Sequence, residues 1–233
     1  MRKLVLAVLV LLVVVVPASA QDKPVTINIG GGVLFPLSGL NDAFNTGWDG
    51  GIGATFNVSP TFGLQTEYMY NWMPGPERTI LVSPVPGGAT SAQLIESNHN
   101  IHSVTFNGIV SSPRSSTVGG YGVGGIGYYH RTVQLTSPAV GYATVCDPYW
   151  YWCYPAAVSV DNILVDRSQD NFGINVGGGV TFGGESVKFY AEIRYHYVWG
   201  SEVRQQVAVP GGPCEQGCST NAQYLPITFG VRW

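Results

Sequence analysis

Three glycines between residues 121 and 131 spell G-x-G-x-x-G, at Gly122, Gly124 and Gly127. Glycines at that spacing can bring a backbone close to a dinucleotide pyrophosphate when a strand precedes them, a helix follows and an acidic residue lies about 20 positions on. Asp147 stands near that position, but the residues after Gly127, Tyr-Tyr-His-Arg-Thr-Val, favour a strand and have no helical apolar stripe. We therefore predict a strand here and no cofactor.

Four cysteines are a second candidate for chemistry, as disulfides or as metal ligands: Cys146, Cys153, Cys214 and Cys218. Cysteine zinc sites usually contain a C-x2-C pair, whereas the spacings here are C-x6-C and C-x3-C with no histidine nearby. We predict no metal site and favour disulfides that join Cys146 to Cys153 and Cys214 to Cys218. Two pairings between the loops are alternatives.

His102 and Ser103 are a third candidate, because a histidine beside a serine suggests a nucleophile and its base. Adjacent residues of a strand point to opposite faces, so these two cannot form a dyad if the segment is a strand. The other histidines, His99, His130 and His196, have no recognisable serine and acid arrangement in the sequence. We predict no catalytic residues and no enzyme, while a triad, being defined by geometry, can escape a search of the sequence.

The first 20 residues have the pattern of an export signal. Arg2 and Lys3 precede an apolar run over 4–16, and Pro-Ala-Ser-Ala ends at Ala20. Thirteen apolar residues are too few for a helix to span about 30 Å of hydrocarbon. We predict that 1–20 is a cleaved signal peptide and that 21–233 forms one domain.

The composition of the chain is unusual for a soluble protein. Charged residues make up 11%, against about 25% in soluble domains, and 31 residues are glycine. The formal net charge of −3 argues against nucleic acid as a partner, because phosphate binding needs a basic face. No later segment has 18 consecutive apolar residues, so a closed β-barrel is the remaining way to reside in a membrane.

Alternation of apolar and polar residues dominates the chain and predicts strands. Short turns alternate with long loops near 38–47, 74–98, 134–169 and 200–221. This pattern predicts an all-β fold, an eight-stranded antiparallel up-and-down transmembrane β-barrel with short periplasmic turns and long extracellular loops. The eight expected strands are 25–37, 48–58, 62–73, 99–111, 116–133, 170–183, 187–199 and 222–233.

The two faces of the strands decide between this barrel and a soluble lipocalin-like barrel with an apolar lumen. The apolar faces carry aromatics towards both ends, such as Tyr68, Tyr70 and Trp72 at one end and Phe62 at the other. Lipid-facing strands need two such girdles. The abundant glycines would relieve crowding where the wall of a narrow barrel bends and let large neighbours fill the interior.

The opposite faces are polar and carry charges that we assign to the lumen. Glu67 and Glu192 lie at matching depths on opposed strands, and Arg194, with Lys188 or Arg232, could pair with them. Buried charges need such partners, since an isolated one costs several kcal/mol. We expect a structural ion network, with an ion-conducting gate as the alternative.

The export signal, the eight strands and the C-terminal segment together resemble the small OmpA/OmpX-like outer-membrane β-barrel family. In that family a terminal aromatic preceded by alternating apolar residues is recognised by the barrel-assembly machinery. The residues that match this signal are Ile227, Phe229, Val231 and Trp233. The resemblance implies residence in the bacterial outer membrane, contact with its lipid and a monomeric barrel.

One loop gathers aromatics around a predicted disulfide: Tyr149, Trp150, Tyr151, Trp152 and Tyr154 lie between or beside Cys146 and Cys153. They could pack on themselves as a cap over the barrel mouth, or form a recognition tip on a rigid scaffold. We expect a non-enzymatic barrel with a role in envelope integrity, adhesion or surface recognition. A narrow porin-like channel and a lipid-active outer-membrane enzyme are the alternatives.

Overall fold

A computed structural model of the chain describes residues 24–82, 91–112, 117–147, 152–184, 186–200, 202–203 and 218–233. Apart from a single 3-10 turn, η1 (Ser38–Leu40), the regular elements of this part are strands. They are β1 (Val25–Leu37), β2 (Gly47–Asn57), β3 (Phe62–Pro74), β4 (Arg78–Val82), β5 (Ser91–Ser111), β6 (Val118–Asp147), β7 (Trp152–Gly183), β8 (Lys188–Val198), β9 (Glu202–Val203), β10 (Cys218–Ser219) and β11 (Ala222–Arg232). None of the helical residues described forms a segment long and apolar enough to cross a bilayer.

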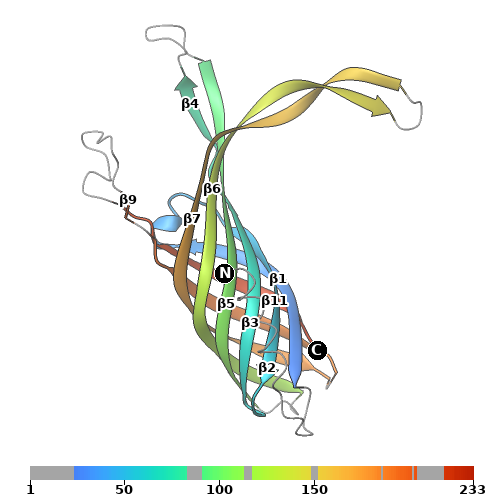
Figure 1. Cartoon of the computed structure of the whole chain (residues 1–233), viewed down its shortest axis with the longest axis vertical. Coiled ribbons are helices and arrows are strands. Elements are labelled where there is room, and N and C mark those ends of the chain that lie inside the picture. Colours follow the sequence, from blue (N-terminus) through green and yellow to red (C-terminus); the bar gives the residue numbers. More distant parts are fainter. Residues whose placement is uncertain are drawn as a thin grey trace, which may run out of the picture.

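Eight of these strands close into a barrel (Figure 1). Each strand pairs antiparallel with its neighbours in the order β1, β2, β3, β5, β6, β7, β8, β11, and β11 returns to pair with β1. The last and first strands meet at the rim of short turns, where the backbones of Ile27 and Trp233 exchange hydrogen bonds of 2.9 and 3.0 Å. The predicted eight-stranded up-and-down antiparallel barrel is confirmed.

Alternation along each strand separates an apolar outside from a polar inside. On β3 and β5 the outward side chains Leu64 and Phe106 are 53% and 60% exposed, whereas the inward Gln65 and Asn107 are 2% and 3% exposed. Apolar side chains left on the outside would face water in a soluble barrel, at a cost that grows with their area. This arrangement is the reverse of a lipocalin-like barrel.

Glycines make room in the wall for three large rings in the lumen. A Cβ added at Gly127 or Gly173 would come within 2.9 or 2.7 Å of the ring of Tyr129. One at Gly179 would approach Tyr121 to 2.7 Å, and one at Gly230 would approach Tyr190 to 2.6 Å. The G-x-G-x-x-G segment therefore lies inside β6 as barrel wall, as its strand-forming neighbours predicted.

The strands β5, β6 and β7 are much longer than predicted. The expected loop 134–169 is mostly a two-stranded ribbon that continues β6 and β7 beyond the barrel, and the expected loop 74–98 contains β4 paired with an extension of β5. These two extensions, the β4–β5 arm and the β6–β7 arm, project from the rim opposite the short turns (Figure 1). A two-stranded ribbon in solvent has no buried face, so the alternation that predicts strands in the wall is missing from its sequence.

The β6–β7 arm curves away from the β4–β5 hairpin (Figure 1). A register shift interrupts its pairing, because Leu135 pairs with Val165 and Thr136 with Ile163, which leaves Leu164 as an extra residue in β7. Such a bulge bends and twists the strand that carries it. At about 3.3 Å per residue, the paired residues 133–147 make this arm on the order of 45 Å long.

Candidate functional site

Arg194 of β8 joins the two acidic residues of the lumen. Its guanidinium forms ion pairs with Glu67 of β3 and with Glu192 of its own strand, and the three side chains are at most 6% exposed. Each carboxylate accepts one further hydrogen bond: Asn28 donates to Glu67 at 3.1 Å, and the Tyr121 hydroxyl donates to Glu192 at 2.7 Å. Every ionised group of this cluster thus faces an opposite charge or a hydrogen-bond donor, as burial requires.

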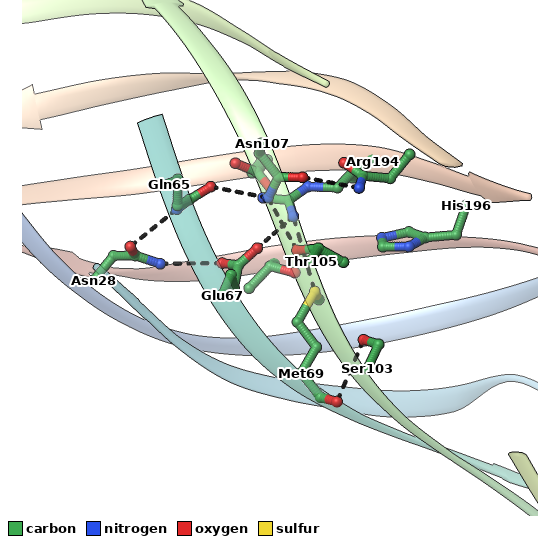
Figure 2. A network of polar contacts seen from close by, with 12 residues as sticks. Asn28, Gln65, Glu67, Met69, Ser103, Thr105, Asn107, Arg194 and His196 are labelled. Carbon is green, nitrogen blue, oxygen red and sulfur yellow. Dashed lines mark hydrogen bonds and ion pairs between the residues drawn. The ribbon is translucent and has the colours of Figure 1, made fainter. Parts of the chain in front are cut away.

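Amide side chains extend this cluster across the barrel (Figure 2). Gln65 donates to Asn28 at 3.0 Å, Asn107 donates to Gln65 at 3.3 Å, and Asn175 of β7 donates to Asn107 at 2.9 Å. The chain of amides links β1, β3, β5 and β7 from side to side. A connected polar network of this kind fixes the positions of its members.

Apolar and aromatic side chains fill the lumen on the side of the arms. The buried cluster there consists of Leu34, Leu40, Met73, Ile101, Tyr129, Val198, Ala222 and Tyr224, with Phe44 packed against it. His196 stacks on Tyr224 with ring centroids 4.8 Å apart and hydrogen-bonds Tyr129 over 3.0 Å. Near the rim, Arg131 donates to the carbonyl of Thr220 at 2.7 Å. A packed cluster therefore lies between the ion network and the open end.

The remaining predicted lumen charges lie nearer the short turns. Arg232 of β11 places its guanidinium 4.8 Å above the ring of Tyr121 and 5.4 Å from that of Tyr190. Lys188 is its neighbour across the β8–β11 pair. The structure thus brings Glu67, Glu192 and Arg194 into one cluster and places Arg232 next to it, over the ring of Tyr121, which donates to Glu192. Sequence reasoning missed Asp49, buried on β2, which accepts a hydrogen bond of 2.7 Å from Thr228.

On the outer face, four side chains form a row across adjacent strands at the base of the arms. Tyr70, His102, His130 and Asp170 are direct cross-strand partners on β3, β5, β6 and β7. The Nδ1 atom of His130 lies 2.6 Å from a carboxylate oxygen of Asp170, and its Nε2 lies 3.5 Å from the Thr132 hydroxyl. A nucleophile-type hydroxyl, an imidazole and a carboxylate thus follow one another in space.

Asp170 lies three residues beyond the first residue pair of β7 with β8, outside the closed part of the wall. The hydrogen bond from His130, and after it one from Tyr128, lowers the pKa of the Asp170 carboxyl below its ordinary value. The ionised carboxylate accepts from the Nδ1–H of His130, and in the neutral imidazole Nε2 is then the acceptor.

His102 and Ser103 point to opposite faces, as predicted for neighbours on a strand. His102 lies outside, 2.7 Å from the Tyr68 hydroxyl, whereas Ser103 is buried and hydrogen-bonds the carbonyl of Met69 at 3.5 Å. His130 has no recognisable acid partner in the sequence because Asp170 is 40 residues away and reaches it only through strand pairing. The spacing His-x-Thr was the available signal, since residues two apart on a strand share a face.

At the tip of the longer arm, Cys146 and Cys153 are cross-strand partners joined by a disulfide. Tyr154, next to it, is 46% exposed. Tyr149, Trp150 and Tyr151 lie outside the described residues, as does Cys214, while Trp152 begins β7 and Cys218 begins β10. The predicted pairing of Cys214 with Cys218 thus stays a prediction.

The C-terminal strand presents its predicted assembly signal to the outside. Phe229 is 59% and Trp233 44% exposed, while the alternate residues Tyr224 and Thr228 are buried. Ile227 and Val231 lie on the outward face with them.

No protein-family model and no curated protein matches the chain. Solved structures with a similar fold include a major outer membrane protein from Thermus thermophilus, with 11% identity over 91% of this chain and 99% of that one and a TM-score of 0.48. Neisserial surface protein A has 15% identity over 91% and 97%, with a TM-score of 0.47. Ail, the attachment invasion locus protein of Yersinia pestis, has 12% identity over 91% and 100%, with a TM-score of 0.43. At such identities and TM-scores, the likeness says nothing about the function of this chain.

Proposed function

We propose that this protein is an integral barrel of the bacterial outer membrane, with a closed lumen and arms that recognise a partner at the cell surface. In this proposal residues 1–20 are removed as a signal peptide, and the mature chain, 21–233, is a monomer that the barrel-assembly machinery inserts through its C-terminal signal. Its role lies in adhesion, surface recognition or envelope integrity.

The observation that carries the location is the apolar outer surface. Ile126, Phe106 and Val176 are 60% or more exposed on the outer surface of the wall. Aromatic residues flank this band on both sides: Tyr68, Trp48 and Trp199 near the arms, and Phe62, Phe182, Phe189 and Trp233 near the short turns. Lipid accommodates this surface, because a hydrocarbon core of about 25 Å flanked by aromatic girdles is what outer-membrane barrels present.

Heat-modifiability tests the location. Detergent-solubilised outer membranes are run on SDS gels with and without boiling, and we expect the unboiled protein to migrate differently because the folded barrel resists SDS. A protein that is recovered from the soluble periplasm, with the same mobility before and after boiling, would refute the proposal.

The filled lumen favours a structural barrel over the porin-like alternative. The ion network around Arg194 and the apolar cluster around Tyr129 occupy successive levels of the interior. An eight-stranded barrel is just wide enough for side chains to fill it. In planar bilayers we expect no unitary conductance steps, and reproducible steps from the purified monomer would overturn the closed lumen.

Recognition by the arms is supported by their reach and by the disulfide at the tip. Rigid scaffolds commonly present binding residues on loops, and aromatic side chains are frequent anchors. The test compares cells that display the full chain with cells in which 136–163 is replaced by Asn-Gly, both checked by the gel shift. We expect the shortened variant to lose attachment to epithelial monolayers, while equal attachment would refute a recognition role for this arm.

A further inference from the structure

The outer face at the base of the arms holds three groups in the order that acyl transfer requires. The Thr132 hydroxyl lies 3.5 Å from Nε2 of His130, and Nδ1 of the same ring lies 2.6 Å from Asp170. A His–Asp pair alone is an ordinary surface ion pair that contributes little to stability. With a hydroxyl at the other ring nitrogen, the three groups match the arrangement of a nucleophile, its general base and the acid that orients the base.

Strand register explains how a wall with no active-site loop assembles these groups. Thr132 and His130 are two residues apart on β6 and so share the outer face, and Asp170 is the direct cross-strand partner of His130 on β7. The distance of 3.5 Å is long for a hydrogen bond between hydroxyl and imidazole, but such contacts often tighten only when a substrate is bound.

The cross-strand neighbour of the nucleophile carries a side-chain amide. Asn100 of β5 is the cross-strand partner of Thr132, and its side-chain oxygen accepts a hydrogen bond of 3.0 Å from Tyr70. This contact orients the amide so that its nitrogen is the end that can donate. A side-chain amide is among the groups that stabilise a tetrahedral oxyanion.

The surroundings indicate the class of substrate. Two residues from His130 and Asp170 towards the membrane band, Tyr128 and Phe172 pack edge to face with centroids 6.0 Å apart. Ile126 and Phe106 continue this surface, 65% and 60% exposed. The His130 and Asp170 side chains themselves are 43% and 59% exposed, so water can reach them. A lipid ester at the membrane surface would place its acyl chain on this apolar surface and its carbonyl beside Thr132 and His130.

We propose that Thr132, His130 and Asp170 hydrolyse an acyl ester of a lipid in the outer leaflet. The Thr132 oxygen attacks the carbonyl carbon and its proton passes to His130 Nε2. The ester C–O bond then breaks, and His130 returns the proton to the leaving alcohol. Water, deprotonated by His130, then attacks the acyl-threonine. The bond to the Thr132 oxygen breaks, His130 returns the proton to that oxygen, and the fatty acid leaves.

This activity goes beyond surface recognition but rests on the outer-membrane location. The probes are vesicles of phosphatidylglycerol and vesicles that contain an O-acylated glucosamine lipid, each with the purified full chain inserted, and the readout is free fatty acid. We expect release from one or both, and the pattern identifies the lipid. No release from either by a protein that keeps its gel shift would overturn the hydrolase alone, whereas loss of the shift would count against the location.

Four variants and one matched control separate chemistry from structure. We expect Thr132→Val, His130→Gln and Asp170→Asn each to reduce release by about 100-fold or more, while Thr132→Ser keeps it. The matched control is Asp166→Asn, an exposed aspartate further out on the same ribbon that accepts a hydrogen bond of 3.2 Å from Gln134, and it should stay within about threefold of the parent. Equal losses in the two aspartate variants, or full release by Thr132→Val, would overturn the assignment.

Discussion

Replacing Arg194 by methionine tests whether the lumen is a dry ionic network. The substitution keeps the length of the apolar stem but removes the one cation that pairs with both Glu67 and Glu192. Two unit charges about 4 Å apart interact by about 4 kcal/mol at an effective dielectric constant near 20, and desolvation offsets much of this. Removing one partner of a buried pair costs about 3–5 kcal/mol, so we expect Arg194→Met to lose about that much folding free energy.

The same electrostatic reasoning ranks the loss of folding free energy expected for other variants of the Arg194 cluster. Glu67→Gln leaves Arg194 paired one to one with Glu192 and keeps a side chain that can accept from Asn28, so we expect a loss of about 1 kcal/mol. Glu192→Ala removes the partner of both Arg194 and Tyr121 and should fall between the two. The triple variant Glu67→Gln, Glu192→Gln, Arg194→Met buries no charge in this cluster and should recover most of the loss.

Urea unfolding in phospholipid vesicles, followed by tryptophan fluorescence, measures these differences, and the gel shift reports how much barrel remains. If Arg194→Met costs less than about 1 kcal/mol, water screens the cluster and the lumen is open to solvent. A triple variant no more stable than Arg194→Met would contradict the electrostatic origin of the loss.

Three further variants probe the wall, the arm and assembly. A Cβ at Gly125 would lie 2.0 Å from the carbonyl oxygen of Phe106, whereas one at Gly122 has its nearest contact at 4.0 Å, so Gly125→Ala should abolish the gel shift and Gly122→Ala should keep it. Replacing Cys146 and Cys153 by serine removes a cross-link worth about 2–3 kcal/mol to the arm, and limited proteolysis should then cleave the arm while the barrel keeps its shift; an arm that stays resistant would argue against bracing by the disulfide. Trp233→Ala should slow the appearance of folded barrel in pulse-chase experiments and leave its final urea resistance within about 1 kcal/mol; unchanged assembly would refute the C-terminal signal.

The wall of the barrel was predictable because each strand has two different environments. Burial inside and lipid outside force residues such as Glu192 and Ile193 to alternate, and this alternation is visible in one sequence. The arms have the same solvent on both faces, so β4 and the outer halves of β6 and β7 carry no such signal. The bulge at Leu164 likewise follows from pairing, which a single strand does not record.

The interior contacts were predictable in kind and not in detail. A polar lumen with buried acids requires cations, which pointed to Arg194. Which cation meets which acid depends on how far adjacent strands are staggered, so the sequence left open whether Lys188 or Arg232 joins Arg194. Asp49 of β2 and Thr228 of β11, 179 residues apart, meet over Gly32 of β1, which pairs with both.

The distribution of strand lengths places the external features of the protein on one side of the barrel. The strands β1, β2, β8 and β11 end near the rim, while β5, β6 and β7 continue into the arms and carry His102, His130 and Asp170 at their base. A filled lumen leaves the outer wall and the arms as the surfaces that can meet a ligand. Because β6 holds both Thr132 and the disulfide of the tip, a partner that binds the tip would be anchored on the same ribbon as the polar row. Recognition and lipid chemistry would therefore share one strand, and shortening the arm should affect attachment without moving the row, whose register is set within the wall.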